Sequence, residues 1–294
     1  MRLLRNRIEI KTPDQVRLMR RAGLVVADVH AALREAVRPG VTTGELDAVC
    51  AATIERAGAR SNFKGYYDYP ATVCISVNEE VVHGIPGKRV LREGDLVTFD
   101  CGACVLDESG TEWHGDAAFT TVVGGRYASD ADRVLDATTR RALWAAIAAL
   151  ARALAGDASG RAGRINTVGD TVEDVVAEAC RDYDVSLGIL EDYVGHGIGT
   201  AMHMEPDVLN YSVRRRGARL RPGMVLAVEP MLTAGEPEVE ELDDGWTVVT
   251  ADGSNAAQWE HTVALVPGGV WVLTASDGGV EGLDPYGIEP RPLR

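Results

Sequence analysis

The sequence has 294 residues, of which 46% are hydrophobic, so the chain can bury a sizeable core as one large domain or two small ones. Its formal net charge of −14 argues against general binding to nucleic acid or to anionic membranes, which needs clustered Lys and Arg. There is no apolar run of about 18–20 residues and the first thirteen residues do not resemble a secretory signal, so we expect a soluble, cytoplasmic protein.

Two helix starts stand out near the beginning of the chain. Thr12, Pro13 and Gln15 form a capping pattern that predicts a helix from Pro13 to a stop before Pro39-Gly40. A second capping pattern at 42–45 predicts a helix that ends near Gly58. Alternating apolar residues then predict three strands, and Ala-rich or amphipathic periodicity predicts two further helices. These strands are 72–77, 96–100 and 119–123, and the helices are about 130–154 and 168–181, separated by a small-residue break at 156–163.

The two halves of the chain resemble each other weakly. GVTTGELDAVCAATIERAG is similar to NTVGDTVEDVVAEAC about 125 residues later, and REGDLVTFD is similar to RPGMVLAVEP at an offset of 129. We therefore expect a single domain, 1–294, with pseudo-two-fold pseudo-repeats at about 40–125 and 165–266. The Gly- and Pro-rich tail, 274–294, is expected to be ordered only in part. The predicted fold class is α+β.

The five cysteines and the one basic run are interpreted as structural. An odd number of cysteines in a chain of this size predicts reduced thiols. Cys101 and Cys104 form a CxxC pair, but a zinc ribbon needs a second pair, so we expect packing thiols. The arginines at 214–216 are expected to form a solvated loop.

Five side chains in distinctive local settings point to a metal site. Asp100 ends LVTFD, Asp116 ends WHGD, His196 lies in GHGIG, Glu229 ends VLAVE and Glu260 lies in QWEH. Each one alone is compatible with a strand end, a turn or an ordinary loop. Together, four buried carboxylates cost several kcal/mol each unless they are paired. Two divalent cations would neutralise them, so the set predicts a two-metal hydrolase site.

Longer motifs around these residues carry a family resemblance. YPATVCISVNEEVVHGIP, HGDAAFT, GHGIGTAMHMEP, MVLAVEPML and QWEHTVAL occur in this order, and they resemble the short bacterial form of type I methionine aminopeptidases. These are peptidases of the M24 family with the pita-bread fold, in which helices flank antiparallel sheets and a dinuclear metal site lies between the sheets. The resemblance covers about residues 11–273. It implies metal-dependent removal of the N-terminal methionine from nascent proteins and peptides, with a preference for a small second residue.

The resemblance also implies how the ligands are shared. Asp116 and Glu260 are expected to bridge the two metals, Asp100 to complete one, and His196 with Glu229 to complete the other. The metals are Co, Mn, Fe or Zn, because a carboxylate-rich site with one imidazole accepts all of them.

Further residues are implied to contact the substrate. By resemblance, His203 contacts the scissile carbonyl oxygen, His83 lies on the nitrogen side of that bond, and Glu229 is the proton shuttle. The methionine pocket is implied to be lined by Phe63, Tyr66, Tyr69, Cys74, Met202 and Trp246. The position of Phe63 often carries Cys in bacterial relatives, so this Phe is expected to narrow the pocket.

The segment between Asp100 and Asp116 departs from the family. The two positions are sixteen residues apart, which is longer than usual, and we interpret CVLDESGTEW as a lengthened hairpin tip. Asp116 remains the expected ligand because the HGDAAFT segment that contains it matches the family pattern, and Asp107 is the alternative if the register differs.

Three other functions stay open at this stage. One is an Xaa-Pro-type aminopeptidase of the same fold, which shares the five ligands. The second is a non-catalytic binding module of this fold, and the third is a structural metal protein. The expected partners are peptide and nascent-protein N-termini, with transient ribosome association left open. No nucleic-acid specificity, no membrane and a monomeric state are expected.

Overall fold

The computed structural model describes residues 8–156 and 163–293. Its helices and 3-10 turns are α1 (Pro13–Ala36), α2 (Thr43–Arg56), η1 (Tyr66–Asp68), η2 (Val123–Gly125), α3 (Asp130–Ala155), α4 (Thr167–Tyr183), α5 (Val280–Leu283) and η3 (Asp284–Tyr286). Its strands are β1 (Arg60–Ser61), β2 (Cys74–Val77), β3 (Glu80–Val82), β4 (Leu96–Leu106), β5 (Glu112–Val122), β6 (Gly188–Ile189), β7 (Gly195–Gly197), β8 (Met204–Val208), β9 (Val225–Val228), β10 (Met231–Thr233), β11 (Val239–Glu241), β12 (Val248–Thr250), β13 (Ala256–Gln258), β14 (His261–Val266) and β15 (Gly269–Val272). Most of the predicted small-residue break lies outside the described residues.

The predicted helix starts are confirmed by their hydrogen bonds. The Thr12 hydroxyl accepts from the Gln15 amide and the Gln15 side chain accepts from the Thr12 amide, which satisfies two donors that a helix start leaves free. Thr42 and Glu45 form the same reciprocal pair at the start of α2. The two later helices also agree with the sequence prediction within about two residues at each end.

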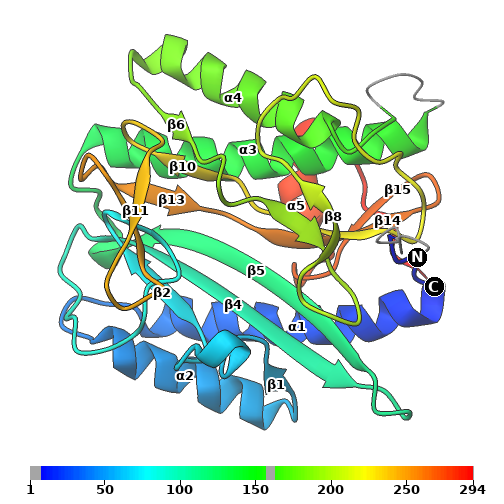
Figure 1. The fold of residues 1–294 in the computed structure, drawn as a ribbon, viewed down its shortest axis with the longest axis horizontal. Helices are drawn as coiled ribbons and strands as arrows, with labels where there is room; N and C mark the ends of the chain where they lie inside the picture. Colours follow the sequence, from blue (N-terminus) through cyan, green and yellow to red (C-terminus); the bar gives the residue numbers. More distant parts are fainter. Residues whose placement is uncertain (1–7, 157–162, 294) are drawn as a thin grey trace, which may run out of the picture.

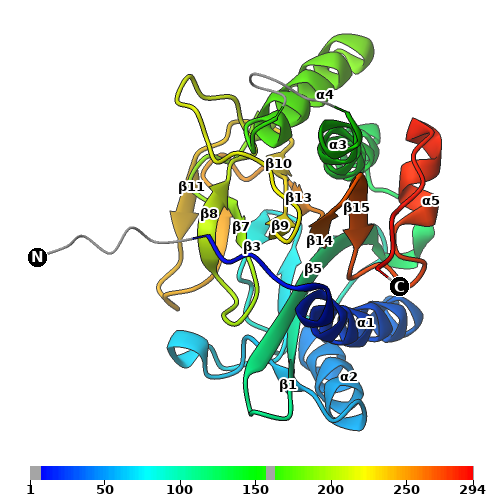
Figure 2. The same ribbon diagram turned by 90° about the vertical axis from the view of Figure 1, so that its right-hand side faces the viewer.

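Antiparallel sheets lie between two pairs of helices, as the α+β prediction requires. The strand order is β1-β4-β2, with β5 paired to β4, in one sheet and β15-β14-β9-β7-β8 in another. Two three-stranded sheets, β13-β10-β6 and β11-β12-β3, complete the strands. Figure 1 shows α1 and α2 along one side and α3 and α4 along the opposite side, with the strands between them. In the view turned by 90°, α1, α2, α3 and α5 lie on the right, and β7, β8 and β11 lie toward the left (Figure 2).

Each helix pair buries an apolar face against its own sheet. One core cluster joins α1 and α2 to β2, β4 and β5 around Phe99 and Phe119. A second joins α3 and α4 to β9, β14 and β15 around Leu143, Ile147 and Leu226. This arrangement agrees with two similar halves, although the assignment of pseudo-repeats at 40–125 and 165–266 stays a prediction. No helix in the described residues is long and apolar enough to cross a membrane.

The hairpin of β4 and β5 is longer than predicted. The sequence predicted strands of five residues each, whereas the two strands pair without interruption from Leu96↔Val122 to Leu106↔Glu112. CGAC and HGDAA lie outside the predicted strands, but they are paired in register, and only 107–111 form the turn. The expected lengthened tip is therefore mostly additional strand, which continues one sheet face beyond the ligand positions.

The C-terminal tail is also more ordered than predicted. Within 274–293, α5 and η3 pack on α3: Leu283 is fully buried and the Tyr286 hydroxyl donates to the Arg141 carbonyl at 3.2 Å. The Arg291 amide donates to the Val270 carbonyl at 2.7 Å. The expectation of partial order is wrong for these residues, because a few apolar side chains among many glycines are enough to hold the segment.

Three hydrogen bonds connect the two main sheets where the predicted ligands lie. The Asp116 amide donates to the Thr262 hydroxyl at 3.0 Å, and this hydroxyl donates to the Asp116 carbonyl at 2.8 Å. The Glu260 amide donates to the Ala118 carbonyl at 2.9 Å. These bonds fix the first-half carboxylates against the second-half carboxylates.

Gly23 tests how closely α1 packs on the sheets. A Cβ at this position would overlap the Leu273 carbonyl, and the Gly115 backbone also lies against Gly23. We expect Gly23→Ala to reduce the free energy of unfolding by about 1–3 kcal/mol through overpacking, despite the better helix propensity of Ala. Urea unfolding measures this, with the exposed Ala31→Gly as a control that loses about 1 kcal/mol through propensity alone. An unchanged or increased stability of Gly23→Ala would contradict the close packing.

Candidate metal centre

All residues that the sequence assigned to metal and substrate line one cavity of about 360 Å³. The cavity lies between the two halves, and its walls come from both sheets and from the loops that connect them. At one end it holds the five predicted ligands, Asp100, Asp116, His196, Glu229 and Glu260. The remaining predicted residues around it are Phe63, Tyr66, Tyr69, Cys74, His83, Met202, His203 and Trp246.

Strand register brings Asp100 and Asp116 onto the same face of the β4–β5 hairpin. Asp100 lies opposite Ala118, and Asp116 lies opposite Gly102. Alternate side chains of a strand share a face, so the two carboxylates are diagonal neighbours across the pair. Asp116 is buried, and its backbone is held by Thr262 of the facing sheet. The long hairpin therefore supplies two acidic groups from one rigid element.

His196 lies between two glycines that allow close packing of the backbone. A Cβ on Gly195 would overlap the Ala227 carbonyl, and one on Gly197 would overlap the Glu205 carbonyl, so both positions require glycine. The His196 Nδ1 lies 2.9 Å from the Gly197 carbonyl, which only accepts, so this nitrogen carries the hydrogen. Nε2 is left with a lone pair and lies 3.6 Å from the Glu229 carboxylate. Burial lowers the pKa of His196 to about 3, which keeps the ring neutral and suited to bind a cation.

Glu229 and Glu260 complete the acidic end from the second half. Glu229 follows β9, and the Gln258 amide donates to its carboxylate at 3.2 Å. Glu260 lies between β13 and β14 and is almost fully buried. Ligand atoms of Asp116, His196 and Glu260 all lie within 4.8 Å of one another.

The acidic end fits divalent cations. Asp100 Oδ1, Asp116 Oδ1 and Glu260 Oε1 are buried and have no hydrogen-bond partner among the described residues. Burial raises the pKa of Asp100 to about 7, and burial with the neighbouring carboxylates raises the pKa of Asp116, Glu229 and Glu260 well above the usual range. Such a cluster is costly without positive charge, and oxygen-rich ligands with one imidazole are the donors that divalent metals bind in hydrolytic sites.

Two further histidines, His83 and His203, line the cavity beside the predicted ligands. The Tyr66 hydroxyl and the His203 Nδ1 are 2.9 Å apart, and the rings of His203 and His196 have centroids 4.4 Å apart. His83 adopts a left-handed backbone conformation, with φ of 59°, and its ring lies against Tyr193 and Trp246. Burial, and the proximity of His203, lower the pKa of His83 to about 4.

The other end of the cavity is apolar and lined by aromatic and sulfur-containing side chains. Phe63, Tyr69, Cys74 and Met202 form one buried cluster, with Trp246 packed against it. Phe63 and Tyr69 contact edge to face, with centroids 6.5 Å apart. Such a lining suits a slender, flexible, unbranched side chain.

The alternative ligand Asp107 has a different role. Its carboxylate accepts from the Ser109 and Thr111 amides at 2.9 and 3.0 Å and from the Trp113 indole at 3.0 Å. The Ser109 hydroxyl also donates to this carboxylate at 2.6 Å, and this bond, followed by that of Trp113 and those of the two amides, lowers the pKa of Asp107 to about 2 and organises the turn of the hairpin. Asp107 is not one of the described residues that line the cavity, whereas Asp116 is.

Sequence reasoning missed several residues of the cavity wall. Gln258 bonds Glu229, and its position two residues before Glu260 in AAQWEH was a usable signal. Tyr67 and Tyr193 lie at the wall in loops whose conformation no periodicity predicts. Tyr67 is 79% exposed and has a left-handed backbone, so it stands at the rim.

The fold and this cavity define a class of enzyme. Residues 17–267 match the model of metallopeptidase family M24, so the chain belongs to this family, and the pita-bread fold is confirmed. The chain is 45% identical over 265 residues to methionine aminopeptidase 1 of Mycobacterium tuberculosis, which covers 90% of this chain and 94% of that protein. It is similar to the crystal structure of methionine aminopeptidase from Thermotoga maritima, with a TM-score of 0.80, 35% identity, and coverage of 92% of this chain and all of that one. Prolidase from Pyrococcus furiosus, at 20% identity and a TM-score of 0.65, shares the fold, and the match covers 91% of this chain and 65% of that one.

Separate replacement of Asp116 and Asp107 tests which of the two binds metal. We expect Asp116→Asn to weaken binding of the catalytic metals by more than tenfold, since even outer partners of ligands contribute that much. Asp107→Asn should leave metal content unchanged and slightly destabilise the hairpin. Metal content after dialysis, measured by mass spectrometry, decides between them. Metal loss in Asp107→Asn together with full retention in Asp116→Asn would overturn the assignment.

The raised pKa values predict how the metal-free protein responds to pH. A carboxyl group whose pKa is higher in the folded than in the unfolded protein stays protonated in the folded state over a pH range where the unfolded chain has already ionised. The free energy of unfolding therefore falls as the pH rises above the unfolded pKa. We expect the free energy of unfolding of chelator-treated protein to fall between about pH 4 and pH 7, by about 1.4 kcal/mol per pH unit for each such group. Urea unfolding at pH 5 and pH 7.5 measures the decrease, and added Mn²⁺ should abolish most of it. A flat profile without metal would contradict the cluster's charge repulsion.

Proposed function

We propose that this chain is a metal-dependent methionyl aminopeptidase that removes the N-terminal methionine from peptides and nascent proteins, with a preference for a small second residue. One observation carries this proposal. The cavity joins an acidic, cation-binding end directly to an apolar end lined by Phe63, Tyr69, Cys74 and Met202. A substrate whose first side chain occupies the apolar end has its first peptide bond beside the acidic end. The named relatives of M. tuberculosis and T. maritima support the same reading.

The number and identity of the cations belong to this proposal. Two divalent cations would be held by Asp100, Asp116, His196, Glu229 and Glu260. Four carboxylates carry four negative charges, which two divalent cations balance. When bound, such cations supply Lewis-acid activation of water and of the scissile carbonyl. Co, Mn, Fe and Zn all suit these donors, and availability decides among them.

Protein side chains supply the remaining steps. Glu229 takes the proton of the attacking water and delivers it to the leaving amine, a role that its raised pKa and its hydrogen bond to Gln258 support. His203, oriented by the Tyr66 hydroxyl, donates to the oxygen of the scissile carbonyl as negative charge develops there. His83 contacts the nitrogen side of the bond. Met202 and Trp246, at the apolar end, exclude water from the first side chain.

Phe63 sets the width of the apolar end in this proposal. It is 7% exposed, and its ring meets Tyr69 edge to face, so its position is well fixed. A bulky ring there favours an unbranched side chain over a β-branched one, because one misplaced methylene in an apolar pocket costs about 1–3 kcal/mol.

The proposal also covers the cellular compartment, the oligomeric state and the partners of the protein. We propose a cytoplasmic, monomeric protein that acts on nascent chains and associates transiently with the ribosome. All five cysteines are free, which suits a reducing compartment. The substrates themselves emerge at the ribosome as unfolded N-termini.

An Xaa-Pro-type aminopeptidase is the alternative within the same fold. It would use the same five ligands, and the likeness to a prolidase shows that the fold is shared. The buried aromatic and sulfur-containing end favours methionine at the first position instead.

Steady-state cleavage of a short peptide panel tests the proposal. Protein stripped of metal and resupplied with Mn²⁺ or Co²⁺ should release free methionine from Met-Ala-Ser, with at least tenfold lower kcat/KM for Ala-Pro peptides, since methylene-sized differences in such pockets give 10–200-fold discrimination. Protein without resupplied metal is the control. Cleavage restricted to bonds before proline would favour the alternative, and no turnover despite binding of two ions would favour a non-catalytic module.

A further inference from the structure

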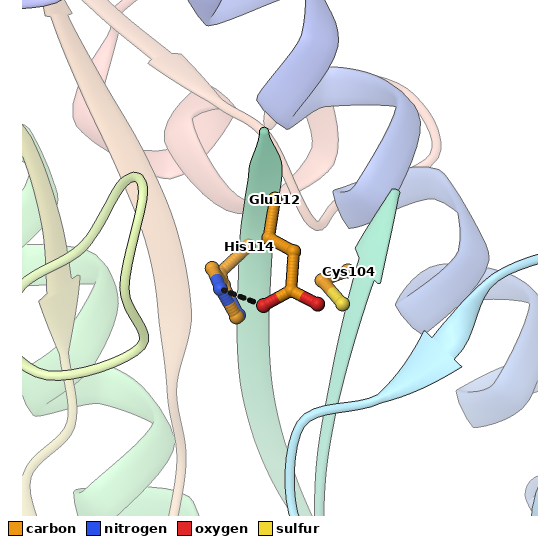
Figure 3. Close-up of side chains that lie close together, drawn as sticks. All are labelled: Cys104, Glu112 and His114. Carbon is orange, nitrogen blue, oxygen red and sulfur yellow. Dashed lines mark ion pairs between the residues drawn. The ribbon is translucent and has the colours of Figure 1, made fainter. Parts of the chain in front are cut away.

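A second group of metal-binding side chains lies on the β4–β5 hairpin, outside the catalytic cavity. Cys104, Glu112 and His114 point toward one another from the two strands (Figure 3). One ligand atom from each, a thiol sulfur, a carboxylate oxygen and an imidazole nitrogen, lies within 4.8 Å of the others. None of the three is among the described residues that line the cavity.

Strand register holds the three side chains together. Cys104 lies directly opposite His114, and Glu112 is two residues from His114 on the same strand. Side chains in these positions project from the same face of an antiparallel pair. The group exists because the hairpin continues beyond the catalytic aspartates, so the additional strand residues provide this second site.

The hydrogen bonds of Asn62 prepare His114 as a ligand. The Asn62 Nδ2 donates to the Gly115 carbonyl at 3.1 Å, which fixes the orientation of the amide. Asn62 Oδ1 lies 2.9 Å from the His114 Nδ1, and an oxygen of this kind only accepts, so Nδ1 carries the hydrogen. Nε2 then has its lone pair free, 3.8 Å from the Glu112 carboxylate. An orienting partner on the second nitrogen is typical of histidines that bind metals.

Asn62 also separates this group from the catalytic carboxylates. A Cβ on Gly102 would overlap the Asn62 side chain, so Asn62 covers the hairpin face at Gly102. Gly102 is the residue opposite Asp116, and Cys104 is the next residue along that face. The thiol and the catalytic aspartate are therefore on the same face but on either side of an amide.

An arginine currently balances the carboxylate. Arg60 contacts Glu112 at 3.3 Å, and its side chain is 65% exposed. An exposed ion pair of this kind contributes little to stability, so a cation can replace the guanidinium at small cost. Glu112 is itself 43% exposed, which leaves its carboxylate free to move toward a bound ion.

We propose that Cys104, Glu112 and His114 bind one Zn²⁺-class ion, with water in the fourth position. One thiolate, one imidazole and one carboxylate match a tetrahedral site with three protein ligands, whose donor atoms stand about 3.3–3.8 Å apart. The thiolate selects Zn²⁺ or Co²⁺ over Mg²⁺ or Mn²⁺, in contrast to the oxygen-rich catalytic end. The inference stands independently of the proposed function, because it uses none of the catalytic residues.

Co²⁺ titration of chelator-stripped full-length protein tests the site. A bound thiolate gives a thiolate-to-cobalt charge-transfer absorption that oxygen and imidazole ligands do not give. We expect this band in the unaltered protein and in Cys180→Ser, the matched control, and its loss in Cys104→Ser. Glu112→Gln should weaken the Co²⁺ binding that produces this band by at least tenfold. Arg60→Gln should strengthen the same binding by removing the competing cation.

Several outcomes would overturn the site. They are a band that persists in Cys104→Ser, no band in the unaltered protein at saturating Co²⁺, and equal affinity in Glu112→Gln. Because Glu112 is partly exposed, Glu112→Gln keeps the test valid if Cys104→Ser fails to fold, and circular dichroism checks both variants. Methionine release from Met-Ala-Ser is measured on the same samples. Its absence alongside an intact band would count against the proposed function and leave this site standing.

Discussion

The concentration of buried acidic groups is the constraint on which the rest of the structure depends. Asp116 and Glu260 are almost completely shielded from water, and Asp100 and Glu229 lie beside them, with the Gln258 amide donating to the Glu229 carboxylate. Packing alone does not hold four such groups together, because their mutual repulsion and lost hydration oppose it. The two sheets bring them together through hydrogen bonds that run from one half to the other, at Asp116 with Thr262 and at Ala118 with Glu260. The two sheets therefore hold four carboxylates close together, and bound cations make this concentration of negative charge favourable.

Many helices and the residues of the cavity could be predicted from the sequence, because their signals lie in short stretches of the chain. Capping patterns at Thr12 and Thr42 fixed the helix starts because they require only four consecutive residues. The gathering of acidic and aromatic residues in one cavity followed from a family resemblance over most of the chain, and the model match to residues 17–267 confirms the family. The individual roles of the cavity residues stay predictions, which the geometry supports without testing them.

What could not be read depends on partners far away in the chain. The hairpin strands were predicted too short because apolar alternation covered only 96–100 and 119–123, whereas the paired strands continue through Gly102 and Gly115, which give room to Asn62 and α1. The tail looked loose because its glycines hid a packing role, in which Gly282 lies against the Trp144 ring. Asn62 carried no recognisable motif, since its importance comes only from Gly102, Gly115 and His114 meeting around it. In each case tertiary contact overrode local propensity.

The hydrogen bond between His196 and its neighbour's carbonyl has a consequence for proton traffic. Because Nδ1 is committed to the Gly197 carbonyl and Nε2 faces the acidic cluster, His196 has no nitrogen left with which to pass a proton onward. A relay needs a group that accepts on one side and donates on the other. His196 therefore cannot relay a proton, although the carboxylates around it titrate. The Tyr66–His203 pair, with its hydroxyl 2.9 Å from Nδ1, lines the same cavity as the buried carboxylates, so a bound substrate that fills the cavity covers both.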